Sequence, residues 1–197
     1  MKLCVLQGTF NPIHNAHLAM ANYTKKTYSY DSILFIPAYK PPHKDFDDDF
    51  ANHRFQMVKL AVSGESSFGI SNIEFQNEKF SYTYITITEL YKRYKIEGKI
   101  GFIIGFDAFR EITEWFEADK LKELVHFIVF PREGEIDKDR LALLHYKGYK
   151  FSVAAMQPID ISSTRIRERL VEGKPVGNLV PPVVLEYINK NGLYKDE

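Results

Sequence analysis

The stretch that most constrains the fold is residues 3–20, where an apolar run is followed by a tight turn and a helical pattern. Residues 3–6 carry no charge, which is typical of a strand buried on both faces of a parallel sheet. The chain then turns at Gly8 and Pro12, and good helix formers with one apolar side follow from Ala16 onward. The pattern predicts a strand, a turn and a helix in one βα unit, with His14 and His17 at the start of the helix.

These two histidines allow more than one interpretation. They are three residues apart, so both would lie on one side of the first helical turn, where free backbone N–H groups attract anions. A phosphate or nucleotide site and a simple position beside the helix cap both agree with this stretch. A metal site is less favoured, because no nearby Cys, Asp or Glu completes a ligand set with zinc spacing.

Further along the chain, predicted strands alternate with predicted helices. Strands are expected at residues 33–36, 68–75, 100–105, 126–130 and 151–154, and helices at 55–62, 82–94, 136–146, from about 162, and after 181. Ser81 is expected to cap the helix at 82–94, and the helix at 55–62 is expected to turn Arg54 away from its apolar side.

This alternation predicts the α/β class, with a single Rossmann-like, doubly wound parallel sheet and helices on both faces. We expect one domain over residues 1–197, including a C-terminal helical segment at about 162–194. In such sheets ligands sit at the carboxyl ends of the strands, next to the point where strand order reverses. The turn at Gly8 and the corner from Gly105 to Asp107 are therefore expected to be neighbours at the site.

The amino-acid composition limits the kinds of binding partner that we expect. Lys plus Arg and Asp plus Glu both number 26, so overall charge indicates neither a nucleic acid nor a membrane partner. The single cysteine, Cys4, cannot form an intramolecular disulfide, and burial in the first strand would raise the pKa of its thiol. With no apolar run of membrane-spanning length, we expect a cytoplasmic protein, and assembly into a homo-oligomer is left open.

Residues 8–17 read Gly-Thr-Phe-Asn-Pro-Ile-His-x-x-His, which resembles the G-[TS]-F-[DN]-P-x-H-x-G-H signature of the nucleotidylyltransferase superfamily. Within it, the chain is most similar to the bacterial nicotinate-nucleotide adenylyltransferases. Further matches lie, in the family's order, at 41–44 (P-P-H-K), 81–83 (S-Y-T), 102–107 (F-I-I-G-F-D), Trp115, Arg132, 161–167 (I-S-S-T-R-I-R) and 187–194. At the first signature, Gln7 and Ala16 stand where the family usually has glycine. The asparagine often found before P-P-H-K is missing, and the family's R-P-G after the strand at 126–130 reads R-E-G here.

The resemblance implies adenylyl transfer in NAD biosynthesis: nicotinate mononucleotide attacks the α-phosphorus of ATP, giving nicotinate adenine dinucleotide and pyrophosphate. The catalytic residues it implies are His14, His17, Lys44 and Arg167. The ATP-binding residues it implies are Gly8, Thr9, Phe10, His14, His17, Gly105, Asp107, Ile161, Ser162, Ser163, Thr164 and Arg167. For nicotinate mononucleotide it implies Thr83, Trp115, Phe116 and Arg132. Mg²⁺ would be bound through the ATP phosphates, without a set of metal-ligating side chains.

Two other functions stay open at this point. One is a different nucleotidylyltransferase, such as an adenylyltransferase for phosphopantetheine or a cytidylyltransferase; the S-Y-T string and Trp115 argue against both. The other is a nucleotide sensor that keeps the fold without turnover, against which the retained His14, His17, Lys44 and Arg167 argue. Acid or amide preference for the pyridine is not decided by these residues. The loop from about 40 to 50 is a candidate lid over ATP.

Overall fold

The computed structural model describes residues 1–41, 48–76, 81–131 and 136–195. Within these residues, strands β1 (Leu3–Gly8), β2 (Ser32–Pro37), β3 (Phe68–Ile70), β4 (Ile100–Gly105), β5 (Val125–Phe130) and β6 (Phe151–Val153) form one sheet in the order β3-β2-β1-β4-β5-β6. All neighbouring strands are parallel. The α/β class and the parallel sheet predicted from the sequence are confirmed.

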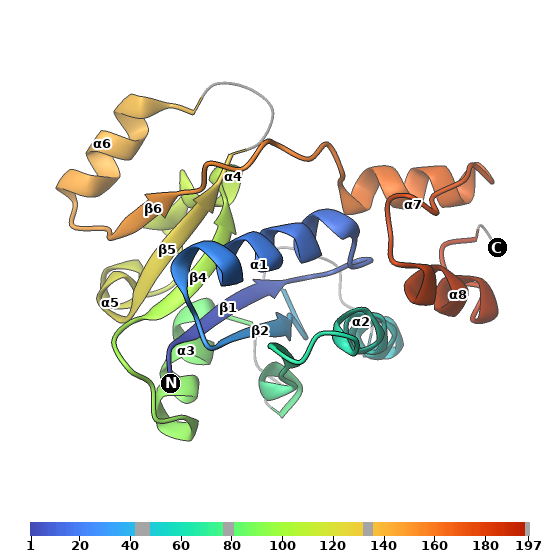
Figure 1. Ribbon diagram of the computed structural model, residues 1–197, viewed down its shortest axis with the longest axis horizontal. Helices are drawn as coiled ribbons and strands as arrows, with labels where there is room; N and C mark the ends of the chain where they lie inside the picture. Colours follow the sequence, from blue (N-terminus) through green and yellow to red (C-terminus); the bar gives the residue numbers. More distant parts are fainter. Residues whose placement is uncertain (42–47, 77–80, 132–135, 196–197) are drawn as a thin grey trace.

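Helices cover both faces of this sheet (Figure 1). The longer ones are α1 (Asn15–Tyr28), α2 (Asp48–Val62), α3 (Thr83–Arg93), α6 (Lys138–Tyr146), α7 (Ser163–Val171) and α8 (Pro182–Lys190). Shorter ones are η1 (Ile73–Gln76), α4 (Phe106–Phe109), η2 (Ile112–Glu114) and α5 (Ala118–Leu124). None of the helices in the described ranges is long and apolar enough to cross a bilayer.

The strands divide the core into two apolar layers, because successive side chains of a strand point to opposite faces. One layer, here called the α1 face, contains Cys4 and Leu6 with residues of α1, α2, α7 and α8. The other, the α3 face, contains Leu3 and Val5 with residues of α3, α5 and α6. Burial raises the pKa of the Cys4 thiol, as expected for a structural cysteine.

The strand order reverses between β1 and β4, since β2 and β3 extend the sheet on one side and β5 and β6 on the other. β1 and β4 are parallel neighbours, with Cys4 paired to Gly101, and they end at Gly8 and Gly105 on the same edge of the sheet. The expected proximity of the Gly8 turn and the Gly105 corner therefore holds. In Figure 1, α7 and α8 lie beyond the carboxyl end of β1.

The prediction for residues 68–75 is wrong beyond Ile70, where the strand ends. Ser71 and Asn72 are turn formers, and the Ser71 hydroxyl accepts the N–H of Ile73 at 3.2 Å while the Asn72 carbonyl accepts the N–H of Phe75 at 2.9 Å. These bonds produce the short helix η1 instead of an extended strand. A further consequence is that Glu74 enters the interior, with only 6% of its surface exposed.

Candidate active site

The turn between β1 and α1 brings the two histidines together. Phe10 has a left-handed backbone, with φ of 49°, and its buried ring packs edge-on against His17 at a centroid distance of 5.0 Å. His14 is the N-cap residue of α1, and its backbone N–H donates to Nδ1 of His17 at 3.2 Å. The two imidazole rings stack at 3.7 Å. Both predicted histidines therefore stand at the start of α1, beside its free N–H groups.

Side chains from the far end of the chain fix this turn. Arg167 donates from Nη1 to the carbonyl of Asn11 at 2.8 Å, and Ser163 donates from Oγ to the carbonyl of Pro12 at 2.9 Å. Tyr194 donates its hydroxyl to Oδ1 of Asn11 at 2.6 Å. Burial raises the pKa of Tyr194, so the phenol keeps its proton as a donor. The structure thus joins two motifs that lie about 150 residues apart in the sequence.

The other predicted ATP residues surround this joint. Ser162 caps α7 by accepting the N–H of Arg165 at 3.3 Å, Ile161 is half-buried against the α1 face, and Thr164 is exposed in the first turn. Gly105 ends β4 and is the N-cap of α4, whose exposed Asp107 follows. These five residues occupy the carboxyl edge of the sheet, on both sides of the point of strand reversal.

The residues predicted for the pyridine lie on the α3 face of the same edge. Thr83 begins α3, and Trp115 packs edge-on against Phe102 at 6.2 Å. Phe116 is 47% exposed, and its ring lies 4.7 Å from that of Tyr82. An exposed aromatic surface next to a helix start is suited to a flat heterocycle. The candidate site therefore has two halves, the histidine turn on the α1 face and these aromatic residues on the α3 face.

Two buried charged residues between these halves were missed by sequence reasoning. Arg54 of α2 was expected on the polar side of its helix, but it is only 5% exposed and donates to the carbonyls of Thr9 (2.7 Å), Ala38 (2.6 Å) and Tyr39 (3.1 Å). Burial lowers the pKa of the Arg54 guanidinium. Glu74 is also buried, and it accepts the backbone N–H of Tyr39, the residue whose carbonyl accepts from Arg54. Burial raises the pKa of the Glu74 carboxyl. No local pattern marks either residue, because their partners are distant in sequence.

A neighbouring prediction also needs correction. Tyr82, and not Ser81, is the N-cap residue of α3. Ser81 instead exchanges two hydrogen bonds with Lys40: its Oγ accepts the backbone N–H of Lys40 at 3.1 Å, and its own N–H donates to the Lys40 carbonyl at 3.0 Å. The segment after β2 is thereby attached to the start of α3.

Lys44 and Arg132 lie outside the described residues, as do residues 42–47 of the candidate lid. Within the described ranges, no three His, Cys, Asp or Glu side chains gather in a way that could hold a metal ion. A magnesium ion held by phosphate oxygens of a nucleotide does not require such a cluster.

Comparison with known proteins identifies the family to which the chain is similar. The cytidylyltransferase-like family model matches residues 5–169. The chain is 38% identical over its full length to all of a protein of Caldicellulosiruptor saccharolyticus named "Probable nicotinate-nucleotide adenylyltransferase". A Clostridium botulinum protein of the same name is 37% identical, over 97% of this chain and 98% of its own.

Solved structures show the same fold. The Plasmodium falciparum nicotinic acid mononucleotide adenylyltransferase, complexed with NaAD, superposes with a TM-score of 0.80 at 21% identity, covering 98% of this chain and 97% of its own. The same enzyme complexed with APC gives a TM-score of 0.77 at 20% identity, over 98% of this chain and 96% of its own. The full-length identity and the matched family model place this chain in the nicotinate-nucleotide adenylyltransferase family of cytidylyltransferase-like proteins.

Proposed function

We propose that this chain transfers the adenylyl group of ATP to the 5′-phosphate of nicotinate mononucleotide, releasing pyrophosphate and forming nicotinate adenine dinucleotide. The observation that carries the proposal is the pair of stacked histidines at the start of α1, fixed by Arg167 and Ser163 at the point of strand reversal. Full-length relatives that bear the name of this activity support it.

The chemistry needs positioning more than proton transfer. The attacking group is already an anionic phosphate, so no general base or covalent nucleophile is required. Catalysis then depends on alignment and on neutralising charge that develops on the α-phosphate and the leaving pyrophosphate. His14 and His17, with the N–H groups of the first turn of α1, would supply donors to the triphosphate, and Ser162 and Arg167 would contact its far end.

The acceptor is proposed to bind at the same carboxyl edge. Phe116 and Trp115 would frame the pyridine ring, and the start of α3 at Thr83 would face the acceptor's anionic groups. Lys44 and Arg132 are proposed as further cations toward the phosphates and the acceptor. Mg²⁺, when bound through ATP, would supply Lewis-acid stabilisation of the charge on the α-phosphate and on the leaving pyrophosphate.

The test is pyrophosphate release from MgATP with nicotinate mononucleotide, nicotinamide mononucleotide and phosphopantetheine supplied in parallel. We expect release with nicotinate mononucleotide to exceed release with the other two by at least about tenfold. If nicotinamide mononucleotide gave the faster release, adenylyl transfer would stand and the assigned acceptor would be wrong. ATP binding without pyrophosphate release for any acceptor would contradict the proposal and favour a sensor.

A further inference from the structure

Glu74 is a buried carboxylate between the two halves of the site. The helix η1 carries it inward, and its Oε1 accepts the hydroxyl of Thr86 at 2.7 Å and an N–H of the Gln7 side chain. Its Oε2 accepts the backbone N–H of Tyr39 at 3.3 Å, and Ser81 also donates to the carboxylate. Donors from three segments, namely β1, the segment after β2 and the start of α3, therefore meet at one side chain that is 6% exposed.

The bond to Gln7 connects Glu74 with the histidine turn. Gln7 is the penultimate residue of β1, and it follows Leu3 and Val5 in the series that points to the α3 face. Its Oε1 is buried and has no hydrogen-bond partner in the described ranges, so the amide is oriented by its bond to Glu74. Gln7 is also one of the two departures from the family signature, where glycine is usual and no such bond could form.

The segment after β2 is held from both faces of the sheet. The peptide N–H of Tyr39 donates to Glu74, and the carbonyl of Tyr39 accepts from Arg54 at 3.1 Å. Arg54 belongs to α2, which packs on the α1 face of the sheet. Glu74 lies on the α3 face, where it contacts Thr86 of α3. Arg54 also holds the Thr9 carbonyl at 2.7 Å, so the two charged residues couple the histidine turn to the Tyr39 segment.

Two of the four donors to Glu74 come from the start of α3, in the half of the site proposed for the acceptor. Thr86 belongs to α3, and Ser81 stands two residues before Thr83 at the start of that helix. Ser81 is also bonded in both directions to Lys40. A change in the carboxylate would therefore shift the start of α3 and the Tyr39 segment together, while the contacts of Arg167 and Ser163 with the turn stay in place.

We propose that Glu74 is a positioning residue for the acceptor: its carboxylate fixes the start of α3 and the Tyr39 segment relative to Gln7 at the end of β1. This inference rests on the proposed function for the identity of the acceptor. Burying an ionisable group is costly unless its hydrogen bonds are satisfied, and here four donors converge on it. These hydrogen bonds offset the cost of burial and hold the two halves of the site in one arrangement. Such an arrangement matters for catalysis, because small misplacements of reacting groups reduce rates strongly.

The test compares Glu74→Gln and Thr86→Val with the control Thr88→Val. Thr86 and Thr88 both lie on α3 and both donate to a carbonyl one turn earlier, Thr86 to Tyr82 at 3.3 Å and Thr88 to Tyr84 at 2.8 Å. Of the two, Thr86 shares its single hydroxyl proton with Glu74, which is the closer acceptor at 2.7 Å. We expect Glu74→Gln to raise KM for nicotinate mononucleotide by about tenfold, and Thr86→Val to raise it less. KM for ATP should change by less than about twofold in all three variants.

Equal loss of kcat in Glu74→Gln and Thr88→Val with both KM values unchanged would overturn the proposal, because it would indicate general destabilisation. Equal rises in KM for ATP and acceptor would also overturn it. Calorimetric binding of nicotinate mononucleotide to each variant gives the same comparison without turnover. If the wild-type protein turned over another acceptor instead, the proposed function would fail, and the same KM comparison with that acceptor would still decide the role of Glu74.

Discussion

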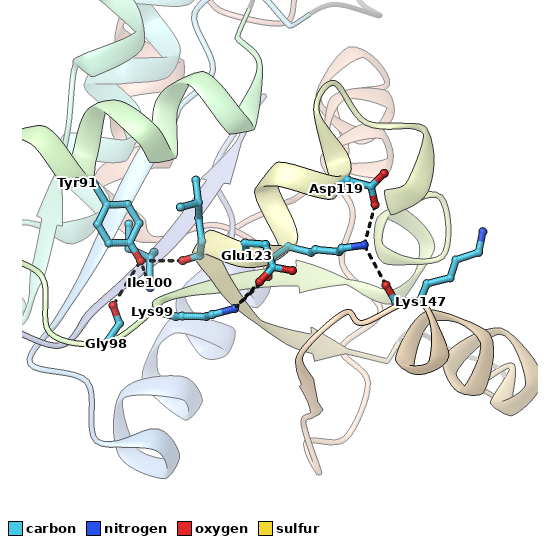
Figure 2. Close-up of polar contacts among 9 residues, drawn as sticks. Tyr91, Gly98, Lys99, Ile100, Asp119, Glu123 and Lys147 are labelled. Carbon is cyan, nitrogen blue, oxygen red and sulfur yellow. Dashed lines mark hydrogen bonds and ion pairs between the residues drawn. The ribbon is translucent and has the colours of Figure 1, made fainter.

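The two edges of the sheet both carry polar networks, but they differ in what the side chains hold. At the amino ends of β4 and β5, the Tyr91 hydroxyl donates to the carbonyl of Leu124 at 2.7 Å and accepts the N–H of Ile100 at 3.1 Å (Figure 2). Beside it, Lys122 donates to Asp119 at 2.7 Å and to the Lys147 carbonyl at 3.0 Å. These bonds join chain segments where strands begin.

At the carboxyl ends two charged side chains are buried, and they bind the backbone of loops. Arg54 and Glu74 are about 5% exposed, whereas Asp119 in its ion pair is 90% exposed. Arg167 and Tyr194 likewise hold Asn11 in the turn before the histidines. Polar side chains at the amino edge therefore join the starts of strands, whereas buried charge at the carboxyl edge fixes the geometry of loops that carry the candidate site.

The largest expected difference between the edges is tested by replacing one histidine at each edge with alanine. His17→Ala removes a ring stacked on His14 at the start of α1, and we expect kcat to fall by about 100- to 1000-fold with modest loss of ATP affinity. His126→Ala at the amino edge removes a bond to Ser152 at 2.9 Å and should leave kcat within about twofold. Steady-state kinetics measure both. Near-normal kcat in His17→Ala would refute its assigned role.

A second comparison uses two arginines of α7. Arg167→Ala removes the charged donor to the Asn11 carbonyl, and we expect kcat/KM for ATP to fall by about 10- to 100-fold. Arg165→Ala is the matched control, because Arg165 is 56% exposed and pairs with Asp160 on the surface. Its kcat/KM should stay within about threefold of wild type. Equal losses in the two variants would show that general charge, and not the held turn, is responsible.

At the amino edge the expected effect moves from activity to stability. Tyr91→Phe removes the hydroxyl that bridges Leu124 and Ile100, so a donor and an acceptor lose their partner. We expect a loss of about 1–3 kcal/mol in the free energy of unfolding, measured by denaturant titration. The kcat/KM for either substrate should not change. A loss of activity at unchanged stability would show that the two edges are not separate in function.

A smaller effect is expected at the carboxyl edge when the pH is varied and the free energy of unfolding is measured. Burial raises the pKa of Glu74, although Arg54 and the donors from Gln7, Ser81, Thr86 and Tyr39 oppose the rise. The folded protein therefore holds this proton more tightly than the unfolded chain, so the contribution of Glu74 to stability is greatest at acidic pH and falls as pH rises through its raised pKa. The Glu74→Gln variant has no carboxyl group at this position and therefore lacks this pH-dependent contribution to stability. The wild-type advantage over the variant in free energy of unfolding should shrink with rising pH, and a growing advantage would contradict the direction of the pKa shift.

Sequence reasoning succeeded where the signal was local. The uncharged run at 100–105 predicted β4, because a strand buried on both faces needs apolar side chains at every position. Ser162 before a basic helix predicted the start of α7, which it caps. The corner from Gly105 to Asp107 was predicted from the end of the uncharged run at 100–105.

It failed where the decisive partner is distant in sequence. Arg54 was expected on the polar side of its helix, but carbonyls 15 to 45 residues away take it into the interior. Glu74 was expected in a strand, but Ser71 and Asn72 turn the chain inward at that point. Such contacts join elements that are distant in the sequence, so neither helical nor strand periodicity can indicate them.

The smallest expected effect is at the exposed pair of the amino edge. Asp119→Asn removes one charge from the contact with Lys122, which is 19% exposed and lies over the Tyr149 ring at 5.5 Å. Lys122 keeps the Lys147 carbonyl and the ring as partners, so the change in free energy of unfolding at neutral pH should lie within the error of a denaturant titration. The ion pair lowers the pKa of Asp119, so any stabilisation it provides exists above the pKa of the unfolded chain and disappears as pH falls. A clear loss of stability at neutral pH in Asp119→Asn, equal to that in Tyr91→Phe, would mean that exposed charge at this edge matters as much as the buried hydroxyl. The contrast between the two edges would then rest on position in the sheet and not on burial.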